Sequence, residues 1–390
     1  MAKLIDITGK ALSGEWGTDD ESGEGIPVIR TTNFTNEGVV DYKEVVTRKI
    51  TKKNIDHKFL RKGDIIIEKS GGSDNFPVGR VIYFDDEENK YLFNNFTGLL
   101  RVKMSEKWYS KYIFYSVFAN YRRGGTRPFE NKTTGLHNLK IDDYVSRFEI
   151  AEIDIEKQII ICKKLDKIYG IKKKREQELR LLDNLIKARF VEMFGSIHGS
   201  TEYPYVALKD LTDVVSGGTP SRENDAFWKD GTIPWVKTTE LQNNVITEVD
   251  EHITEAGLAG SSAKLVPIGT VLVAMYGQGK TRGMTAYLNV EASTNQACAC
   301  ILPSNKIDSM FMWKYIELSY DKLRSLAQGA GQPNLNGKMI KNFKVLVPPI
   351  EMQKTYVEFC HQVDKSKVAV QKALDEAQLL FDSLMQEYFG

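Results

Sequence analysis

The sequence repeats at a spacing of 195 residues, and this repeat limits the possible folds more than any other feature. The segment 155–158, Ile-Glu-Lys-Gln, matches Ile-Glu-Met-Gln at 350–353, and Phe-Gly at 194–195 matches Phe-Gly at 389–390. Both pairs are 195 residues apart. Because similarity at a fixed spacing indicates repeated structural units, the chain is predicted to contain two copies of one unit.

Two further matches lie in the earlier part of each copy. The segment 26–32, IPVIRTT, matches IPWVKTT at 233–239, and GDIII at 63–67 matches GTVLV at 269–273. Their spacings are 207 and 206 residues. The early parts of the two copies therefore differ by insertions, whereas the late parts do not.

The late part of each copy is predicted to be a long helix of a coiled coil. In the second copy, apolar residues recur at the alternating spacing of a coiled-coil seam, with Lys367 in the single gap. The seam residues are Tyr356, Cys360, Val363, Val370, Leu374, Ala377, Phe381, Leu384 and Tyr388. The positions 195 residues earlier repeat this seam with polar interruptions, with Lys172 at the gap. Each helix is expected to span about 35–40 residues, or ~50–60 Å at ~1.5 Å per residue.

The two helices are expected to pair antiparallel, with the remaining modules at opposite ends. The alternative, two unrelated amphipathic helices each packed on its own domain, leaves the shared register unexplained. Two modules, 1–152 and 200–347, are thus each followed by a long helical segment, 153–199 or 348–390.

Each module mixes short strand patterns with a helical patch, and turns rich in Gly, Asn and Pro separate the strands. The strand patterns lie at 63–67, 80–84 and 269–275, and the helical patches at 107–121 and 310–327. The predicted fold class is therefore α+β, with two α+β modules and two long antiparallel coiled-coil helices.

Composition is that of an ordinary globular chain. The 390 residues are 42% hydrophobic and 27% charged, and the net charge is +1, so a nucleic-acid surface would require local clusters of basic residues. The N-terminus has no apolar signal core, and no apolar run has the length of a membrane span, so a cytoplasmic location is expected. The four cysteines lack paired metal-ligand spacing and are expected to be buried free thiols. They are Cys162, Cys298, Cys300 and Cys360.

The segment 269–281, GTVLVAMYGQGKT, resembles the phosphate-binding loop of an ATPase. However, that pattern requires a glycine where Ala274 stands, and a helix must follow the loop. The residues 282–290 instead contain a glycine and alternate like a strand. The matching loop of the first copy, KSGGSD at 69–74, keeps the glycines but not Gly-Lys-Thr, and a nucleotide site would not need such a degenerate second copy.

Catalytic motifs of DNA-modifying enzymes do not emerge from the sequence. An adenine methylase needs an Asn/Asp-Pro-Pro-Tyr/Phe segment to hold the flipped base, and the chain has none. Asp74 with Glu88-Asn89-Lys90 fits a nuclease pattern loosely, but an acidic turn at 85–89 is the simpler interpretation. The five histidines form no metal-binding pair and are interpreted as surface or packing residues. They are His57, His137, His198, His252 and His361.

Polar loops occur at matching points of the two copies. Arg and Lys bind guanine edges, Asn and Gln bind adenine edges, and glycines let the backbone approach phosphates. Each loop alone is better explained as a solvated turn, but their repetition at matching points of the two copies favours DNA contact. The candidate DNA-binding residues are Arg30, Lys69, Ser70, Arg122, Arg123, Arg127, Lys237, Tyr276, Gln278, Lys280, Arg282, Gln332, Asn334 and Asn336.

Two such modules, each followed by a long helix, resemble the specificity subunit of type I restriction-modification systems. The resemblance rests on SGGTP at 216–220, IPW at 233–235 and the Pro-Pro-Ile-Glu-x-Gln segment at 348–353, and it covers nearly the whole chain. It marks 215–219, 233–239, 294–296 and 329–336 as family motifs. The first module departs from the pattern, because Glu-Ile-Asp at 152–154 replaces the usual Pro-Pro and the loop 122–138 is unusually long.

The resemblance implies a non-catalytic subunit whose modules are target recognition domains related by an approximate twofold axis. Each domain would read one half of an asymmetric bipartite site in double-stranded DNA. The helices would set the spacer and dock two modification subunits, which are adenine methyltransferases that bind S-adenosylmethionine. Restriction subunits would bind ATP and magnesium, whereas this chain would bind no metal or cofactor and no membrane. The alternative function is a free-standing DNA nuclease or nucleotide-dependent enzyme that uses Glu88 or Lys280.

Overall fold

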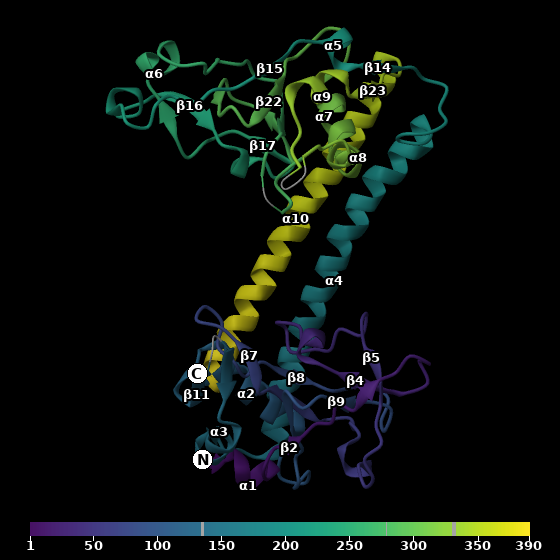
Figure 1. The fold of residues 1–390 in the computed structure, drawn as a ribbon, viewed down its shortest axis with the longest axis vertical. Coiled ribbons are helices and arrows are strands. Elements are labelled where there is room, and N and C mark those ends of the chain that lie inside the picture. The colour runs from purple at the N-terminus through teal and green to yellow at the C-terminus, as the bar shows by residue number, and fades with distance from the viewer. Residues whose placement is uncertain (134–135, 278, 330–332) are drawn as a thin grey trace. The chain divides into compact units, whose positions relative to one another are not determined.

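The computed structural model describes residues 1–133, 136–277, 279–329 and 333–390 (Figure 1). The chain divides into two compact units. Unit 1 comprises residues 1–176 and 372–390, and unit 2 comprises residues 177–371. Each unit combines sheets and short helices with a part of both long helices, so the predicted α+β class is confirmed.

The two long helices are α4 (Ile155–Phe194) and α10 (Ile350–Phe389), each of 40 residues (Figure 1). The periodic pattern in the sequence therefore predicted both helices and their length. Each long helix is shared between the two units: unit 1 contains the first part of α4 and the last part of α10, and unit 2 contains the rest of both helices.

Within unit 1, the first part of α4 packs antiparallel against the last part of α10. The Lys164 Nζ atom lies 3.2 Å from the Tyr388 hydroxyl oxygen, and the Lys172 Nζ atom lies 5.3 Å from the centre of the Phe381 ring. Residues further along α4 thus contact residues nearer the start of α10, as in an antiparallel pair. Leu165 and Phe381 are buried in the same apolar core.

Within unit 2, the same antiparallel arrangement joins the end of α4 to the start of α10. The Lys367 Nζ atom lies 2.7 Å from a carboxylate oxygen of Asp183, and the Arg189 guanidinium lies 5.6 Å from the centre of the Phe359 ring. Lys367, the gap residue of the predicted seam, therefore makes an ion pair with the facing helix.

The seam of α4 differs from the expected one. Cys162 is buried rather than Ile161, which is only partly buried, and Phe190 and Phe194 are buried where the repeat places Arg189 and Met193. The reason lies in unit 2, where these two phenylalanines join a cluster of aromatic rings that includes Phe311, Tyr315 and Tyr356. Burial of this aromatic surface rotates the buried face of the helix away from the strict seam.

The described residues of unit 1 form four sheets around its helices. Two of these sheets have four strands: one has the antiparallel order β2-β10-β6-β8, and the other has the order β3-β5-β4-β9 with a parallel pairing of β4 and β9. The strands are β1 (Ala2–Lys3), β2 (Leu12–Ser13), β3 (Thr18–Asp19), β4 (Ile26–Ile29), β5 (Val46–Lys49), β6 (Ile65–Glu68), β7 (Ser70–Gly72), β8 (Val81–Tyr83), β9 (Leu92–Phe93), β10 (Thr97–Leu100), β11 (Glu130–Thr133), β12 (Leu136–Leu139) and β13 (Glu149–Ile150). The shorter helices are α1 (Leu4–Thr8), α2 (Ser110–Arg122) and α3 (Ile141–Arg147).

Unit 2 repeats this architecture. Its main sheet has the order β15-β22-β19-β20-β17, and β16 pairs antiparallel with β18 and parallel with β21. The strands are β14 (Tyr205–Ala207), β15 (Val214–Ser216), β16 (Ile233–Val236), β17 (Asn244–Ile246), β18 (His252–Ile253), β19 (Val271–Ala274), β20 (Thr285–Leu288), β21 (Ser293–Thr294), β22 (Cys298–Ile301) and β23 (Lys344–Leu346). The shorter helices are α5 (Leu208–Leu211), α6 (Glu255–Ala259), α7 (Ser309–Leu318), α8 (Tyr320–Ser325) and α9 (Gly337–Asn342).

The strand orders confirm the duplication that the sequence predicts. The run β15-β22-β19-β20 corresponds to β2-β10-β6-β8, and the parallel pair β16 and β21 corresponds to β4 and β9. The long loop of unit 1 adds β11 and β12, which form a three-stranded sheet in which β12 pairs with both β11 and β7.

A buried glutamine explains why the Ile-Glu-x-Gln segment recurs. In unit 1, Gln158 Oε1 accepts a hydrogen bond of 2.9 Å from the Tyr109 amide, and Nε2 donates to the Ile153 carbonyl at 2.8 Å. In unit 2, Gln353 Oε1 accepts one of 2.8 Å from the Asp308 amide, and Nε2 donates to the Pro348 carbonyl at 2.7 Å. Because Tyr109 and Asp308 immediately precede α2 and α7, each glutamine joins the start of a module helix to the start of a long helix.

All four cysteines are buried free thiols, as predicted. Burial raises the pKa of the Cys300 thiol to about 11 and also raises the pKa of Cys162, Cys298 and Cys360. Among the residues that the structure describes, His, Cys, Asp and Glu form no group able to hold a metal ion. In the same part of the chain, no helix has both the length and the apolar character needed to cross a membrane.

Candidate nucleic-acid interface

Three segments of unit 2 that lie far apart in the sequence meet at the end of the parallel pair β16 and β21. The Gly218 amide donates to the Thr294 carbonyl at 2.9 Å, and its carbonyl accepts from Trp235 Nε1 at 2.9 Å. The Asn295 amide donates to the Val236 carbonyl at 3.0 Å. The segments brought together are the predicted motifs 215–219, 233–239 and 294–296.

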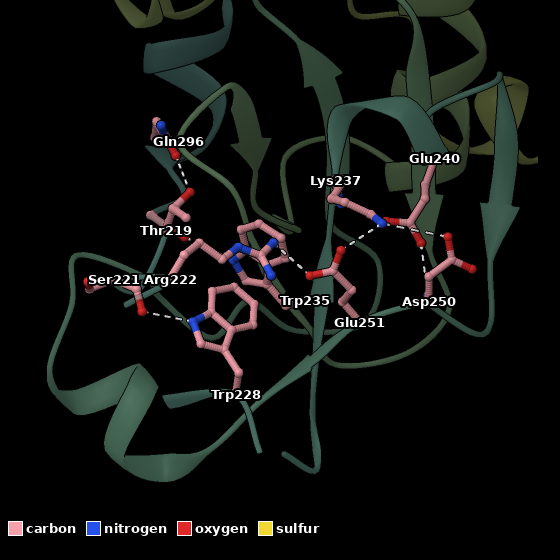
Figure 2. Close-up of polar contacts among 11 residues, drawn as sticks. Thr219, Ser221, Arg222, Trp228, Trp235, Lys237, Glu240, Asp250, Glu251 and Gln296 are labelled. Carbon is pink, nitrogen blue, oxygen red and sulfur yellow. Dashed lines mark hydrogen bonds and ion pairs between the residues drawn. The ribbon is translucent and has the colours of Figure 1, made fainter. Parts of the chain in front are cut away.

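Gly218 is required by this close approach. A Cβ atom added at this position would lie 2.3 Å from the backbone nitrogen of Ala263, so any side chain would displace the main chain. Beyond it, the side chains of Thr219 and Gln296 are exposed and hydrogen-bonded to each other (Figure 2). The junction therefore presents polar groups at the surface above a tightly packed glycine turn.

Arg222 is held beside this junction by stacking on tryptophan rings and by an ion pair. The Arg222 guanidinium lies 3.6 Å from the centre of the Trp228 ring and 5.0 Å from that of Trp235, and its Nη2 lies 2.6 Å from Glu251 Oε2 (Figure 2). The two indole rings are 5.0 Å apart at an interplanar angle of 88°. Stacking and ion pairing together fix the direction of this cation.

Lys237, a candidate DNA-binding residue, belongs to the same network. Its Nζ atom lies 2.9 Å from Glu251 Oε1 and 3.7 Å from Asp250 Oδ2 (Figure 2). The hydrogen bond to Glu251 raises the pKa of Lys237, and the hydrogen bonds from Lys237 and Arg222 lower the pKa of Glu251. Lys237 is therefore held by carboxylates, and a contact with DNA would require it to exchange these partners.

Arg30 occupies the matching position of unit 1. Both residues follow a strand and precede a short 3₁₀ helix, η1 (Thr31–Asn33) or η5 (Thr238–Glu240). The Arg30 amide donates to Asn33 Oδ1 at 3.0 Å, as the Lys237 amide does to Glu240 Oε2 at 2.6 Å. Arg30 Nη2 donates to the Glu44 carbonyl at 3.1 Å. The repeat thus places two different cations on one backbone framework.

The loop between β19 and β20 is a glycine turn and not a phosphate-binding loop. Gly277 and Gly279 have φ angles of 145° and 58°, and the next element is the strand β20. The helix that a nucleotide site requires is therefore replaced by a strand, as the alternation at 282–290 predicted. Tyr276 and Lys280 are exposed in this loop.

Arg282 connects this loop to the segment before α9. Its Nη1 donates to the Pro333 carbonyl, and its own carbonyl accepts from Arg324 Nη1 at 2.7 Å. The Leu335 amide also donates to the Met275 carbonyl at 3.0 Å. The structure thus brings together the predicted loops 276–282 and 329–336, although Gln278 and Gln332 lie outside the described residues.

Two asparagines of the second loop have structural partners. Asn336 Oδ1 accepts from the Met339 amide at 2.9 Å and caps α9, and the Asn334 backbone pairs with that of Gln328. The Oδ1 atom of Asn334 is buried and has no hydrogen-bond partner within the described part of the chain. Asn336 thus acts as a helix cap, which explains its position without reference to DNA.

In unit 1, the candidate basic residues separate into two groups. Lys69 Nζ donates to Ser13 Oγ at 3.0 Å, burial lowers the pKa of Lys69, and the adjacent Ser70 begins β7. Arg122 Nη1 instead lies 2.9 Å from Asp382 Oδ1 of α10. Arg123 is exposed.

The third arginine of the loop 122–138, Arg127, contacts the turn after β7. Its Nη1 and Nη2 atoms lie 3.3 Å and 3.5 Å from the carbonyl oxygens of Asp74 and Asn75. The structure therefore brings Arg127 to the predicted loop 69–74, and it directs Arg122 towards the long helix.

A part-buried ion pair beneath this loop was not predicted from the sequence. Glu68 is 1% exposed and accepts from Arg80 Nη2 at 2.8 Å and Nε at 3.2 Å. Arg80 Nη2 also donates to the Thr31 carbonyl at 3.2 Å and so joins β6 and β8 to η1. In unit 2, strand pairing places Ala274 and Met284 at the positions that match Glu68 and Arg80. These two residues cannot form an ion pair, so the sequence repeat does not predict the pair of unit 1.

The nuclease alternative has no geometric support among the described residues. Glu88 Oε1 accepts from the Lys62 amide at 3.3 Å within an exposed turn, where Asn89 has a φ of 61° and Lys90 pairs with Glu87 at 2.9 Å. Asp74 lies 3.5 Å from His137. The acidic turn predicted at 85–89 is thus confirmed.

Comparison with known proteins supports the resemblance. The type I restriction modification DNA specificity domain matches the chain twice, over residues 1–181 and 201–377. The Escherichia coli specificity subunit of type I restriction enzyme EcoR124I/EcoR124II is 24% identical over 52% of this chain and 51% of that protein. The HindI specificity subunit of Haemophilus influenzae is 25% identical over 46% of this chain and 40% of that protein. The chain thus spans about half the length of these relatives or less.

Two solved structures share the fold over the whole chain. The S subunit of a type I restriction-modification system from M. genitalium has a TM-score of 0.58, at 14% identity, and the match covers 100% of this chain and 95% of that one. A chain from a study of complex assembly and conformational transition of the type I R-M system has a TM-score of 0.57, also at 14% identity, with coverages of 100% and 96%.

Proposed function

Because the chain belongs to the type I restriction modification DNA specificity family, we propose that it is the DNA-reading subunit of such a system. Each unit reads one half of an asymmetric bipartite site in double-stranded DNA. The chain itself performs no catalysis, and it places partner subunits on the DNA that it recognises.

The observation that carries this proposal is one loop framework that appears twice with different side chains. Arg30 in unit 1 and Lys237 in unit 2 begin equivalent 3₁₀ turns. The loop between β6 and β8 carries Lys69, whereas the loop between β19 and β20 carries Tyr276 and Lys280. Since base edges are distinguished by the donors and acceptors that face them, two side-chain sets on one framework suit two different half-sites.

The long helices fit a role as spacer and docking surface for two modification subunits. Both contain large apolar side chains at the surface, including Leu181 of α4 and Val368 and Leu379 of α10. Exposed apolar residues on these helices are available for contact with another protein. The modification subunits carry the adenine methyltransferase activity with S-adenosylmethionine, and restriction subunits carry the ATP- and magnesium-dependent steps.

The proposal is tested by expressing the chain with its modification subunits and mapping methylated adenines by single-molecule sequencing. The expected result is methylation at one asymmetric bipartite sequence that is absent without this chain. A second assay addresses the alternative with the purified chain alone. Turnover of ATP or cleavage of DNA that is abolished by Lys280→Ala or Glu88→Ala would contradict the proposal.

Lys280→Ala is expected to weaken recognition of the second half-site and to leave the first intact. If Lys280 contacts a base, the change costs about 1–3 kcal/mol at one position of the site, whereas a phosphate contact lowers the affinity for all sequences. Arg282→Ala should have the same effect through the loop geometry, because Arg282 binds the Pro333 carbonyl. The measurement is the affinity for duplexes altered in one half-site at a time.

The matched control is Lys365→Ala, which removes the same charge from an exposed position of α10. Its affinity for both half-sites should remain that of the unmodified complex. Equal affinity and an unchanged methylation pattern for Lys280→Ala and Arg282→Ala would remove both residues from the interface.

A further inference from the structure

A tight turn in unit 1 presents a phenylalanine to solvent. Phe76 is 71% exposed, although a buried phenylalanine would contribute about 1.5–3 kcal/mol to folding. The Ser73 amide donates to the Phe76 carbonyl at 2.7 Å, and the Phe76 amide donates to Ser73 Oγ at 3.2 Å. Pro77 follows and restricts the backbone of Phe76. The ring is thus presented by a closed turn.

The turn is also held from both sides. Arg127 lies within 3.5 Å of the carbonyl oxygens of Asp74 and Asn75, and the Asp74 carboxylate lies 3.5 Å from Nε2 of His137. His137 is buried and its Nδ1 lies 2.9 Å from Glu130. These contacts fix the base of the turn, so that the exposed ring projects from a rigid support.

Phe76 borders a cleft whose other wall is basic. The cleft has a volume of about 440 Å³, and its lining includes Phe76, Pro77, Arg122, Arg123 and Arg127. No carboxylate is part of this lining among the described residues. Arg122 is partly neutralised by Asp382, whereas Arg123 is exposed and directly follows α2. A rigid apolar ring beside arginines suits a ligand that is both stacked and anionic.

The matching loop of unit 2 supports this interpretation independently. Tyr276 lies in the loop between β19 and β20, which corresponds to the loop between β6 and β8 that carries Phe76. It too is exposed, at 41%. The two units therefore present an aromatic ring from the same loop of the framework, although their sequences there differ.

We propose that Phe76 inserts as a wedge between two stacked base pairs of the first half-site, while Arg123 and Arg127 bind the adjacent phosphates. Apolar side chains that enter a base step unstack it partly and bend the duplex, and neighbouring basic residues hold the bent backbone. The wedge selects steps that unstack easily, so it contributes to sequence choice without a base-edge hydrogen bond. This inference rests on the proposed DNA-reading function.

The test uses the complex of this chain with its modification subunits and duplexes that carry 2-aminopurine at successive positions of the first half-site. Binding should raise the fluorescence at one base step, because the probe brightens when it is unstacked. Phe76→Ala should abolish this signal and weaken binding about tenfold, in line with the loss of one ring-to-base stacking contact. Phe76→Leu should retain most of the signal, since leucine is also an apolar wedge.

Phe96→Ala is the matched control, because Phe96 is another exposed phenylalanine of unit 1 and does not line the cleft. It should leave the fluorescence signal in place. Thermal stability should be unchanged for Phe76→Ala, since the ring has few contacts to lose.

The outcomes separate this inference from the proposed function. If the unmodified complex selects its site but no probe brightens, or if Phe76→Ala keeps the signal, the wedge is overturned and the reading function stands. If Phe76→Ala instead releases a modification subunit, measured by mass photometry, Phe76 contacts protein and the wedge is overturned. If the unmodified complex shows no sequence selectivity, the proposed function itself fails.

Discussion

Insertion of four residues into both long helices should lengthen the unspecified gap of the DNA target by one or two base pairs and leave both half-site sequences unchanged. Four helical residues add about 6 Å at ~1.5 Å per residue, which is nearly two base pairs at ~3.4 Å each. The original target should lose its methylation altogether. The measurement is the methylated sequence motif, read by single-molecule sequencing from cells that express the variant with its partners.

The structure determines where the insertions belong. α4 and α10 both pass through the division between the units, so lengthening α4 alone after Lys174 would leave α10 at its original length. A second insertion after Gln371 keeps the two helices matched. Lys172 and Lys173 precede the first insertion, so their contacts with Phe381 and Glu37 within unit 1 are retained.

The control inserts the same four residues after Glu87, in the exposed acidic turn of unit 1. Both the gap and the bases should then stay as they are. A double-helix insertion that folds and methylates with an unaltered gap would refute the spacer role of the helices. A change in the half-site bases would refute the assignment of recognition to the loops.

Gln353→Leu should destabilise unit 2 by about 2–6 kcal/mol. Leucine has nearly the same size, but it leaves the part-buried Asp308 amide and the buried Pro348 carbonyl without these hydrogen bonds, and each unpaired group costs about 1–3 kcal/mol. Because a chain with two units need not unfold in one step, local hydrogen exchange at the start of α7 is the appropriate measurement.

Gln362→Leu is the matched control, because Gln362 is exposed on the same helix. It should change stability by less than about 0.5 kcal/mol. Equal protection of α7 in the two variants would show that the glutamine of the repeated segment has no structural role. Gln158→Leu should produce the same loss at the start of α2 in unit 1, since the hydrogen bonds are equivalent.

Features that recur with a regular spacing could be predicted from the sequence. The helices α4 and α10, the strand β19 and the duplicated strand order follow from apolar spacing and from repeated segments, because burial imposes the same pattern in each copy. Lys172 was misjudged, since it was treated as an interruption of the seam. It is 8% exposed, with its aliphatic stem in the helix interface and its ammonium group near the Phe381 ring.

Contacts between segments that lie far apart in the sequence could not be predicted. The residue type of Arg122 predicted a DNA contact, but only the fold reveals that Asp382 of α10 lies next to it. Glu68 and Arg80 form an ion pair because strand pairing brings them together. Both residues are replaced in unit 2, so comparison of the two copies does not predict the pair. For Lys280 and Arg123, DNA contact remains a prediction.

The division of the chain into units has a consequence for its synthesis on the ribosome. Unit 2 is one continuous stretch, 177–371, whereas unit 1 also requires residues 372–390. Phe381 is buried in the same core as Leu4 and Trp108, so this core stays open until the segment 372–390 has been translated. Since open cores expose apolar surface that promotes aggregation, unit 1 is begun first, is completed last and stays exposed to aggregation longest.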